Sequence, residues 1–224
     1  MKDPASPIYG CDAFWNTFWN LNQLWALATP DIMNKWVESL LEYYRVGGWL
    51  PNGPPGVEYC DIMGAQHEIP LMVSAYQKGI RNYDVDKAYE AVKKTLTTQG
   101  TALSSGGIVG NRHLDVYLKY GFVPYGEKSH HNVFGTTYEG PTSNTLEYAF
   151  DDWNAAQFAK ALGYEEDYDY FTRRAYNYKN VFDSETKYVR PKYSDGTWMP
   201  DFEPINKDEH STSWSWLGSG FVEG

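Results

Sequence analysis

The 224-residue chain has little cysteine, and this scarcity limits what can hold it together. Cys11 and Cys60 are its two thiols. They supply neither a disulfide framework nor a zinc site. They are able to pair in an oxidising compartment, but we favour reduced thiols buried as small apolar side chains. Stability must therefore come from a packed core, for which a hydrophobic content of 42% is sufficient.

The chain also lacks an excess of positive charge and a long apolar run. Its 19 basic and 29 acidic residues give a net charge of -10, the opposite of the basic surface expected of a nucleic-acid-binding protein. No apolar stretch approaches the roughly 18 residues that a membrane-spanning helix needs. Residues 1–7 carry no apolar core of the kind found in signal peptides. We therefore expect neither nucleic acid nor a membrane span.

Several common catalytic motifs are missing as well. The sequence has no phosphate-binding loop and no dinucleotide fingerprint. After His67-Glu68, Leu71 stands where a zinc-protease motif has its second histidine. Ser219 lies between two glycines, but Leu217 occupies a position where a nucleophile elbow needs glycine. The sequence therefore carries no motif signature of phosphate-loop or dinucleotide binding, of a zinc protease or of a nucleophile-elbow hydrolase.

Aromatic residues are what the chain has in excess. They make up 17% of it, with 9 Trp and 19 Tyr. Tyr and Trp present flat apolar faces with a polar group at one end, which suits stacking on sugar rings. A large helical core rich in aromatics explains the same composition, and both interpretations stay open.

Apolar periodicity predicts an all-α fold. Phe14, Phe18, Leu21 and Trp25 recur at helical spacing, and a second apolar stripe beside them predicts a helix buried on most sides. Further helices are predicted over residues 30–46, 64–78, 84–96, 111–120, 145–162 and 165–180.

A weak internal repeat indicates how these helices are organised. Residues 75–84 and 158–168 each read as a helix end, a glycine stop, a short polar turn and an acidic helix start. Repeated helical hairpins are typical of a solenoid or a helical toroid. The connections over residues 49–63, 100–110 and 121–142 are long and share one side of the hairpins, which predicts a binding site on that face. No linker divides the chain, so one domain is expected.

The stretch Ser143–Trp153 carries the strongest chemical signal. Glu147, Asp151 and Asp152 lie there among bulky apolar residues. A carboxyl group held against aromatic rings has a raised pKa and can donate a proton near neutral pH. Asn144 and Glu147 also have capping-box spacing, so on spacing alone Glu147 is either a helix cap or a proton donor. His67 and Glu68, at another predicted helix start, either cap that helix or line a cavity.

Four segments together carry a family resemblance: residues 14–25, 47–51, 67–80 and above all the string SNTLEYAFDDW at 143–153. Residues 221–224, FVEG, are similar to the start of a fifth segment, Glu-Gly-Asn. On these residues the chain resembles, nearly end to end, glycoside hydrolase family 92, the calcium-dependent exo-acting α-mannosidases. The resemblance covers part of a catalytic domain.

The resemblance implies a fold, a reaction and a set of site residues. The family's catalytic domain is an (α/α)6 toroid that follows a β-sandwich domain, and its reaction inverts the anomeric centre. A bound Ca²⁺ contacts the vicinal hydroxyls of the sugar. Glu147 falls on the family's general acid, and Glu223 falls in a segment near the metal, which makes it the expected metal ligand. The expected substrate-binding residues are Trp15, Asn16, His67, Glu68, Asp151, Asp152 and Glu223.

Two positions depart from the family pattern. Asn16 and Trp19 stand where many members have Asp and Arg, which bears on sugar and linkage specificity. We expect an exo-α-mannosidase-like hydrolase of N-glycan mannose, α-1,2-type, exported by a bacterium to its periplasm or surface or secreted. The alternatives are a different (α/α)6 glycosidase or lyase, or a non-catalytic helical glycan-binding protein. Residues 1–224 are expected to be the N-terminal portion of one truncated catalytic domain, without the β-sandwich, and inactive alone because the general base and most Ca²⁺ ligands are expected beyond residue 224.

Overall fold

The computed structural model describes residues 8–200 and 202, except 12, 16, 55–58, 60–64, 104–107 and 128–140. Regular structure in these residues is nearly all helical. The helices are α1 (Leu21–Ala28), α2 (Pro30–Gly47), α3 (Glu68–Gln77), α4 (Val85–Thr97), α5 (Leu114–Tyr120), α6 (Pro141–Leu162), α7 (Glu165–Ala175) and the 3-10 helix η1 (Tyr176–Val181). Strands β1 (Thr101–Ala102) and β2 (Ile108–Val109) form an antiparallel pair with Thr101 opposite Val109. None of the described helices is long and apolar enough to cross a membrane.

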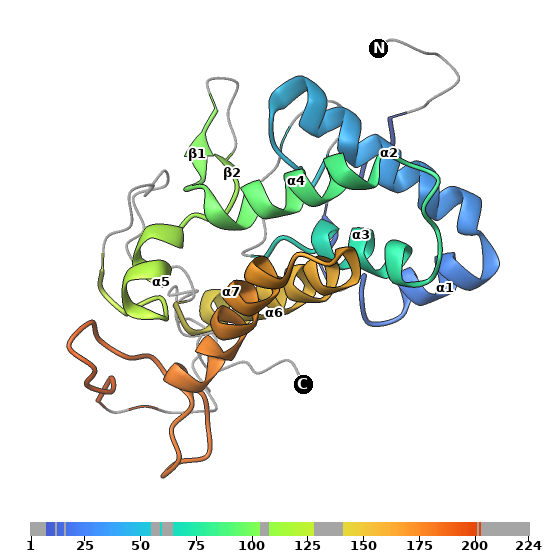
Figure 1. Cartoon of the computed structure of the whole chain (residues 1–224). Coiled ribbons are helices and arrows are strands. Elements are labelled where there is room, and N and C mark those ends of the chain that lie inside the picture. The colour runs from blue at the N-terminus through green and yellow to red at the C-terminus, as the bar shows by residue number, and fades with distance from the viewer. Residues whose placement is uncertain are drawn as a thin grey trace.

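Helix α6 is the centre of the arrangement (Figure 1). It packs along α7 and also contacts α3, α4 and η1, while α1 and α5 lie at opposite ends of the molecule. Buried residues cover most sides of α6, although Trp153 is 51% exposed, which is typical of a helix largely enclosed by others. Phe158 on α6 belongs to the large core that includes Phe14, Met33, Leu40 and Phe171, and Tyr148 belongs to a smaller cluster around Tyr117. Polar residues on α6 are therefore held in fixed surroundings.

The two predicted hairpins are confirmed. Helix α3 ends before Gly79 and α6 before Gly163, and both glycines have left-handed backbone angles, with φ of 83° and 82°. In each turn the residue after the glycine donates its N–H to the carbonyl five residues earlier, Ile80 to Ala75 and Tyr164 to Ala159. This is the Schellman arrangement, in which glycine adopts the left-handed conformation without steric cost. The same local sequence pattern thus produces the same chain reversal twice.

The first helix is shorter than its periodicity predicts. Residues before Leu21 form turns, and α1 runs only to Ala28. Phe14 is buried as expected, but Leu24 and Leu27 on α1 are 58% and 83% exposed, so the prediction of a helix buried on most sides is wrong. Asparagine and threonine have a lower helix propensity than leucine or alanine, which agrees with turns over residues 17–20.

Helix α6 begins four residues earlier than predicted. Pro141 is its first residue, a position that suits proline because the first turn needs no N–H donor. Asn144 therefore lies inside the helix, and the capping-box interpretation of Asn144 and Glu147 is wrong. Helix α3 begins at Glu68, later than the predicted start at 64. The helix predicted over 165–180 is α7 followed by η1.

Two other predictions fall partly outside the described residues. Cys11 is half-buried, whereas Cys60 is outside, so pairing of the two thiols stays untested. Parts of the long connections, residues 55–58, 60–64, 104–107 and 128–140, lie outside the described residues. The binding face that they were expected to form stays a prediction.

Candidate active site

Helices α3 and α6 bring four carboxyl side chains into one region. Glu68 is the first residue of α3, and Glu147, Asp151 and Asp152 follow one another along α6. Residues four apart share a helix face, so Glu147 and Asp151 both point to the α3 side. Three of the four are fully buried, with no exposed surface on Glu68, Asp151 or Asp152. The side chain of Glu147 is 27% exposed, which makes it the member of this cluster that solvent reaches.

Glu147 is held by a histidine from the other helix. The Nε2 atom of His67 lies 2.8 Å from Oε2 of Glu147. His67 precedes α3 and its side chain makes no capping hydrogen bond, so the capping interpretation of this histidine is wrong. Its imidazole is 1% exposed and lies edge-on to Phe18 and Phe150, with ring centroids 5.1 and 6.0 Å away. The aromatic contacts fix the ring, and through it one oxygen of Glu147.

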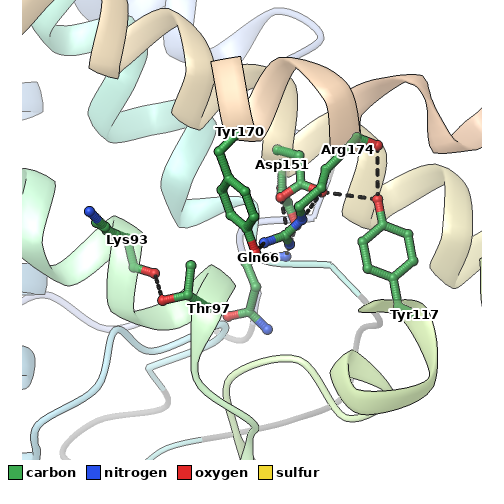
Figure 2. Close-up of polar contacts among 8 residues, drawn as sticks. Gln66, Lys93, Thr97, Tyr117, Asp151, Tyr170 and Arg174 are labelled. Atoms are coloured by element: carbon green, nitrogen blue, oxygen red, sulfur yellow. Dashed lines mark hydrogen bonds and ion pairs between the residues drawn. The ribbon is translucent and has the colours of Figure 1, made fainter. Parts of the chain in front are cut away.

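Asp151 and Glu68 form the buried side of the cluster. Oδ2 of Asp151 accepts a hydrogen bond of 3.0 Å from the backbone N–H of Gln66, as Figure 2 shows. Burial raises the pKa of Asp151 well above its usual value; the Gln66 N–H opposes this, while the charges of Glu147 and Glu68 add to it. Burial also raises the pKa of Glu68, whose side-chain oxygens have no hydrogen-bond partner in the described part of the chain. Both groups therefore favour the protonated form more strongly than an exposed acid does.

Asp152 faces the opposite way, toward α7. Its Oδ2 accepts hydrogen bonds from Nε of Arg174 at 3.0 Å and from the Tyr117 hydroxyl at 2.9 Å. A second guanidinium nitrogen lies 2.7 Å from Oδ1. Figure 2 shows Tyr117 on α5 and Arg174 on α7 pointing toward each other, and the Tyr170 hydroxyl accepts a hydrogen bond from the guanidinium. Burial raises the pKa of Asp152 to about 7, with Arg174 and Tyr117 holding it down against that effect.

The structure clusters some of the predicted site residues, while others lie elsewhere or outside the described residues. The structure brings together His67, Glu68, Glu147, Asp151 and Asp152. The complete burial of Asp151 and Asp152 argues against direct contact with a sugar. Trp15 is 38% exposed in the turns before α1, and Asn16 and Glu223 lie outside the described residues.

The sequence pattern did not point to four residues that organise the site. Phe18 was predicted on an apolar helix face and Phe150 was one of the bulky residues beside the acids, yet both pack edge-on against His67. Arg174 and Tyr117 are the partners of Asp152. A basic residue in the last turn of a helix is commonplace, so Arg174 carried no signal of its own. An unpaired acid predicted to be buried was the one available clue that such a partner had to exist.

The described residues do not by themselves fit a calcium ion. Ca²⁺ takes six to eight oxygen ligands. No three His, Cys, Asp or Glu side chains within the described ranges are grouped so as to hold a metal. The oxygens of Glu68 without partners are fully buried and belong to a carboxyl group that favours its proton. Glu223, the expected ligand, lies outside this part of the chain.

Comparison with known proteins identifies the family. The glycosyl hydrolase family 92 catalytic domain matches residues 1–223. The chain belongs to glycosyl hydrolase family 92. A curated relative from Arthroderma benhamiae, an uncharacterized secreted glycosidase, is 27% identical over 84% of this chain and 27% of its own length.

Solved structures of the family share the fold. An inverting family 92 mannosidase from Bacteroides thetaiotaomicron is 28% identical, with a TM-score of 0.76 over 89% of this chain and 25% of its own. A family 92 α-mannosidase from the same organism is 30% identical, with a TM-score of 0.76 over 95% of this chain and 25% of its own. The latter was also solved with mannoimidazole. The all-α hairpins of this chain are thus part of the (α/α)6 toroid of family 92, and the chain spans about a quarter of these relatives' length.

Proposed function

We propose that this chain contributes the proton donor of an inverting exo-α-mannosidase, with Glu147 as the general acid. One observation carries the assignment: among the four clustered carboxyls, Glu147 is the one that is both partly exposed and fixed by a partner. A general acid has to reach the glycosidic oxygen and keep a defined orientation. Glu68, Asp151 and Asp152 are closed off from a sugar by burial.

The general base is proposed to come from outside the described residues. Inverting glycosidases separate their two carboxyls by about 6.5–9.5 Å, so that a water fits between acid and base. The other acids of this cluster have no exposed surface, so a water beside the sugar does not reach them. The chain spans about a quarter of its relatives' length, and we propose that it is one portion of a longer catalytic domain that does not hydrolyse mannosides by itself.

The substrate is proposed to be a terminal mannose of an α-1,2-type N-glycan, held in part by Trp15, Asn16 and Glu223. The mannosidase names of the structural relatives and the mannoimidazole complex of one of them support this choice. We propose Ca²⁺ as the cofactor, with Glu223 among its ligands; when bound, the ion would polarise the sugar's vicinal hydroxyls. A relative described as secreted supports an exported protein, which we place at a bacterial periplasm or surface. A β-sandwich domain is the proposed intramolecular partner.

Glu147→Gln in the complete protein tests the proposal. The substitution keeps the shape of the side chain and removes its acidic proton. Mannose release from an α-1,2-linked mannobiose should fall about 100- to 10,000-fold, the usual contribution of a general acid. Glu166→Gln, at an exposed position on α7, is the matched control and should leave the rate unchanged.

Two results would contradict the proposal. Undiminished mannose release by Glu147→Gln would remove Glu147 from the mechanism. If the anomeric signal in proton NMR shows α-mannose as the first product, inversion is ruled out. Glycan binding without turnover by the complete protein would favour the non-catalytic alternative, which the half-exposed Trp19 and Trp153 would serve.

A further inference from the structure

His67 is too enclosed to contact a substrate, and its Nε2 atom contacts Glu147. The imidazole is 1% exposed. Phe18 and Phe150 approach it edge-on and also contact each other, with centroids 4.6 Å apart. A ring packed in this way has one orientation available to it, which aims Nε2 at Oε2 of Glu147 over 2.8 Å. The geometry therefore concerns the orientation of the acid, not recognition of the sugar.

We infer that His67 is a positioning residue that donates its Nε2–H to Oε2 of Glu147 and so confines the transferable proton to Oε1. This inference rests on the proposed role of Glu147. A carboxyl group has two oxygens that compete for one proton. An oxygen that already accepts a hydrogen bond from a fixed donor is the poorer site for that proton. The proton then resides on the other oxygen, which the partial exposure of Glu147 leaves available to the leaving group.

The reaction step balances with this arrangement. The proton leaves Oε1 for the glycosidic oxygen, and the electron pair of the O–H bond remains on the Glu147 carboxylate. The bond between that oxygen and C1 breaks with both electrons retained by the leaving group. Water adds to C1 after giving a proton to the general base. Throughout, Oε2 keeps its bond to His67, and this charge-assisted bond is stronger once Glu147 is ionised.

Leaving groups of different basicity separate this role from a purely structural one. A 2,4-dinitrophenyl aglycone leaves without protonation, whereas the sugar aglycone of an α-1,2-mannobiose needs the proton. The complete protein is compared with its His67→Leu and His67→Gln variants on both substrates. His67→Leu should lose about 100-fold or more in kcat/KM on mannobiose, and less than about 5-fold on the dinitrophenyl mannoside, because general acid catalysis contributes 10²–10⁴. His67→Gln keeps an N–H near the Nε2 position and should recover most of the mannobiose rate.

Equal losses by His67→Leu on the two substrates would overturn the inference and leave His67 a packing residue. Failure of His67→Gln to recover the rate would overturn it as well. If the leucine variant does not fold, His67→Asn replaces it, since the shorter amide stays polar but does not reach Oε2, and the same two outcomes apply. Glu147→Gln keeps the two proposals distinguishable: if that variant retains mannobiose hydrolysis, the proposed function fails whatever His67 does.

Discussion

The buried ion pair between Asp152 and Arg174 gives the sharpest stability prediction. Asp152→Asn keeps the shape of the side chain but removes the charge that Arg174 faces at 2.7 Å. The aspartate has no exposed surface and the arginine is nearly enclosed, so the guanidinium would be left uncompensated in the interior. Breaking a buried pair from one side costs about 3–5 kcal/mol. At about 2–4 °C per kcal/mol for a chain of this size, the unfolding midpoint should fall by about 6–20 °C.

The fall in the unfolding midpoint is measured on the full chain by circular dichroism during heating. A pH near 8 is suitable, because burial raises the pKa of Asp152 to about 7 and the carboxylate is ionised above that value. The matched control is Glu42→Gln, which breaks a two-point Arg–Glu contact to Arg45 at the surface. An exposed pair is screened by water, so the control should leave the midpoint nearly unchanged.

A partner substitution makes the reasoning refutable. Combining Asp152→Asn with Arg174→Met removes the unpaired charge, so the double variant should be more stable than Asp152→Asn alone. If Asp152→Asn and Glu42→Gln lower the midpoint equally, burial does not govern the strength of the pair. If the double variant is the least stable of the three, Arg174 stabilises the fold through its packing and not through its charge.

Three further predictions concern the buried acid, the core and the proposed metal. Burial raises the pKa of Glu68 in the folded chain, which therefore keeps a proton above pH 4.5 that the unfolded chain releases, so the free energy of unfolding falls as pH rises through that window. Urea unfolding at pH 5 and pH 8 should show Glu68→Gln more stable relative to the wild type at pH 8 than at pH 5. A difference that is the same at both pH values would contradict this. Phe158→Ala removes a fully buried ring that contacts Tyr76 and Tyr89, and should cost about 3–5 kcal/mol in urea unfolding; a cost below 1 kcal/mol would mean that the core repacks. In the complete protein, chelation should abolish mannose release and Ca²⁺ should restore it better than Mg²⁺, whose octahedral site is smaller; activity unaffected by chelator would favour a metal-independent glycosidase.

Local signals in the sequence were sufficient for the hairpins but not for the site. Gly79 and Gly163 were predictable as helix stops because a left-handed residue favours glycine wherever it occurs. The extent of α1 was not, because the core buries Phe14 without requiring a helix there. Glu147 stood out by its neighbours in sequence. Its contact with His67 spans 80 residues and exists only because α3 packs against α6.

Helix α6 is held on one side by the His67–Glu147 contact and on another by the Arg174–Asp152 ion pair. These two contacts affect how variants of the chain would be classified in a screen for activity. Glu147 and Asp152 are five residues apart, which places them about 140° apart around the helix axis. The contacts with His67 and Arg174 therefore hold two different sides of α6, and together they restrict rotation of the helix about its axis. Under the proposed role of Glu147, loss of the Arg174 contact would shift the position of the acid even in molecules that remain folded. A screen that scores only turnover would then count Asp152 as catalytic, although its carboxylate has no exposed surface.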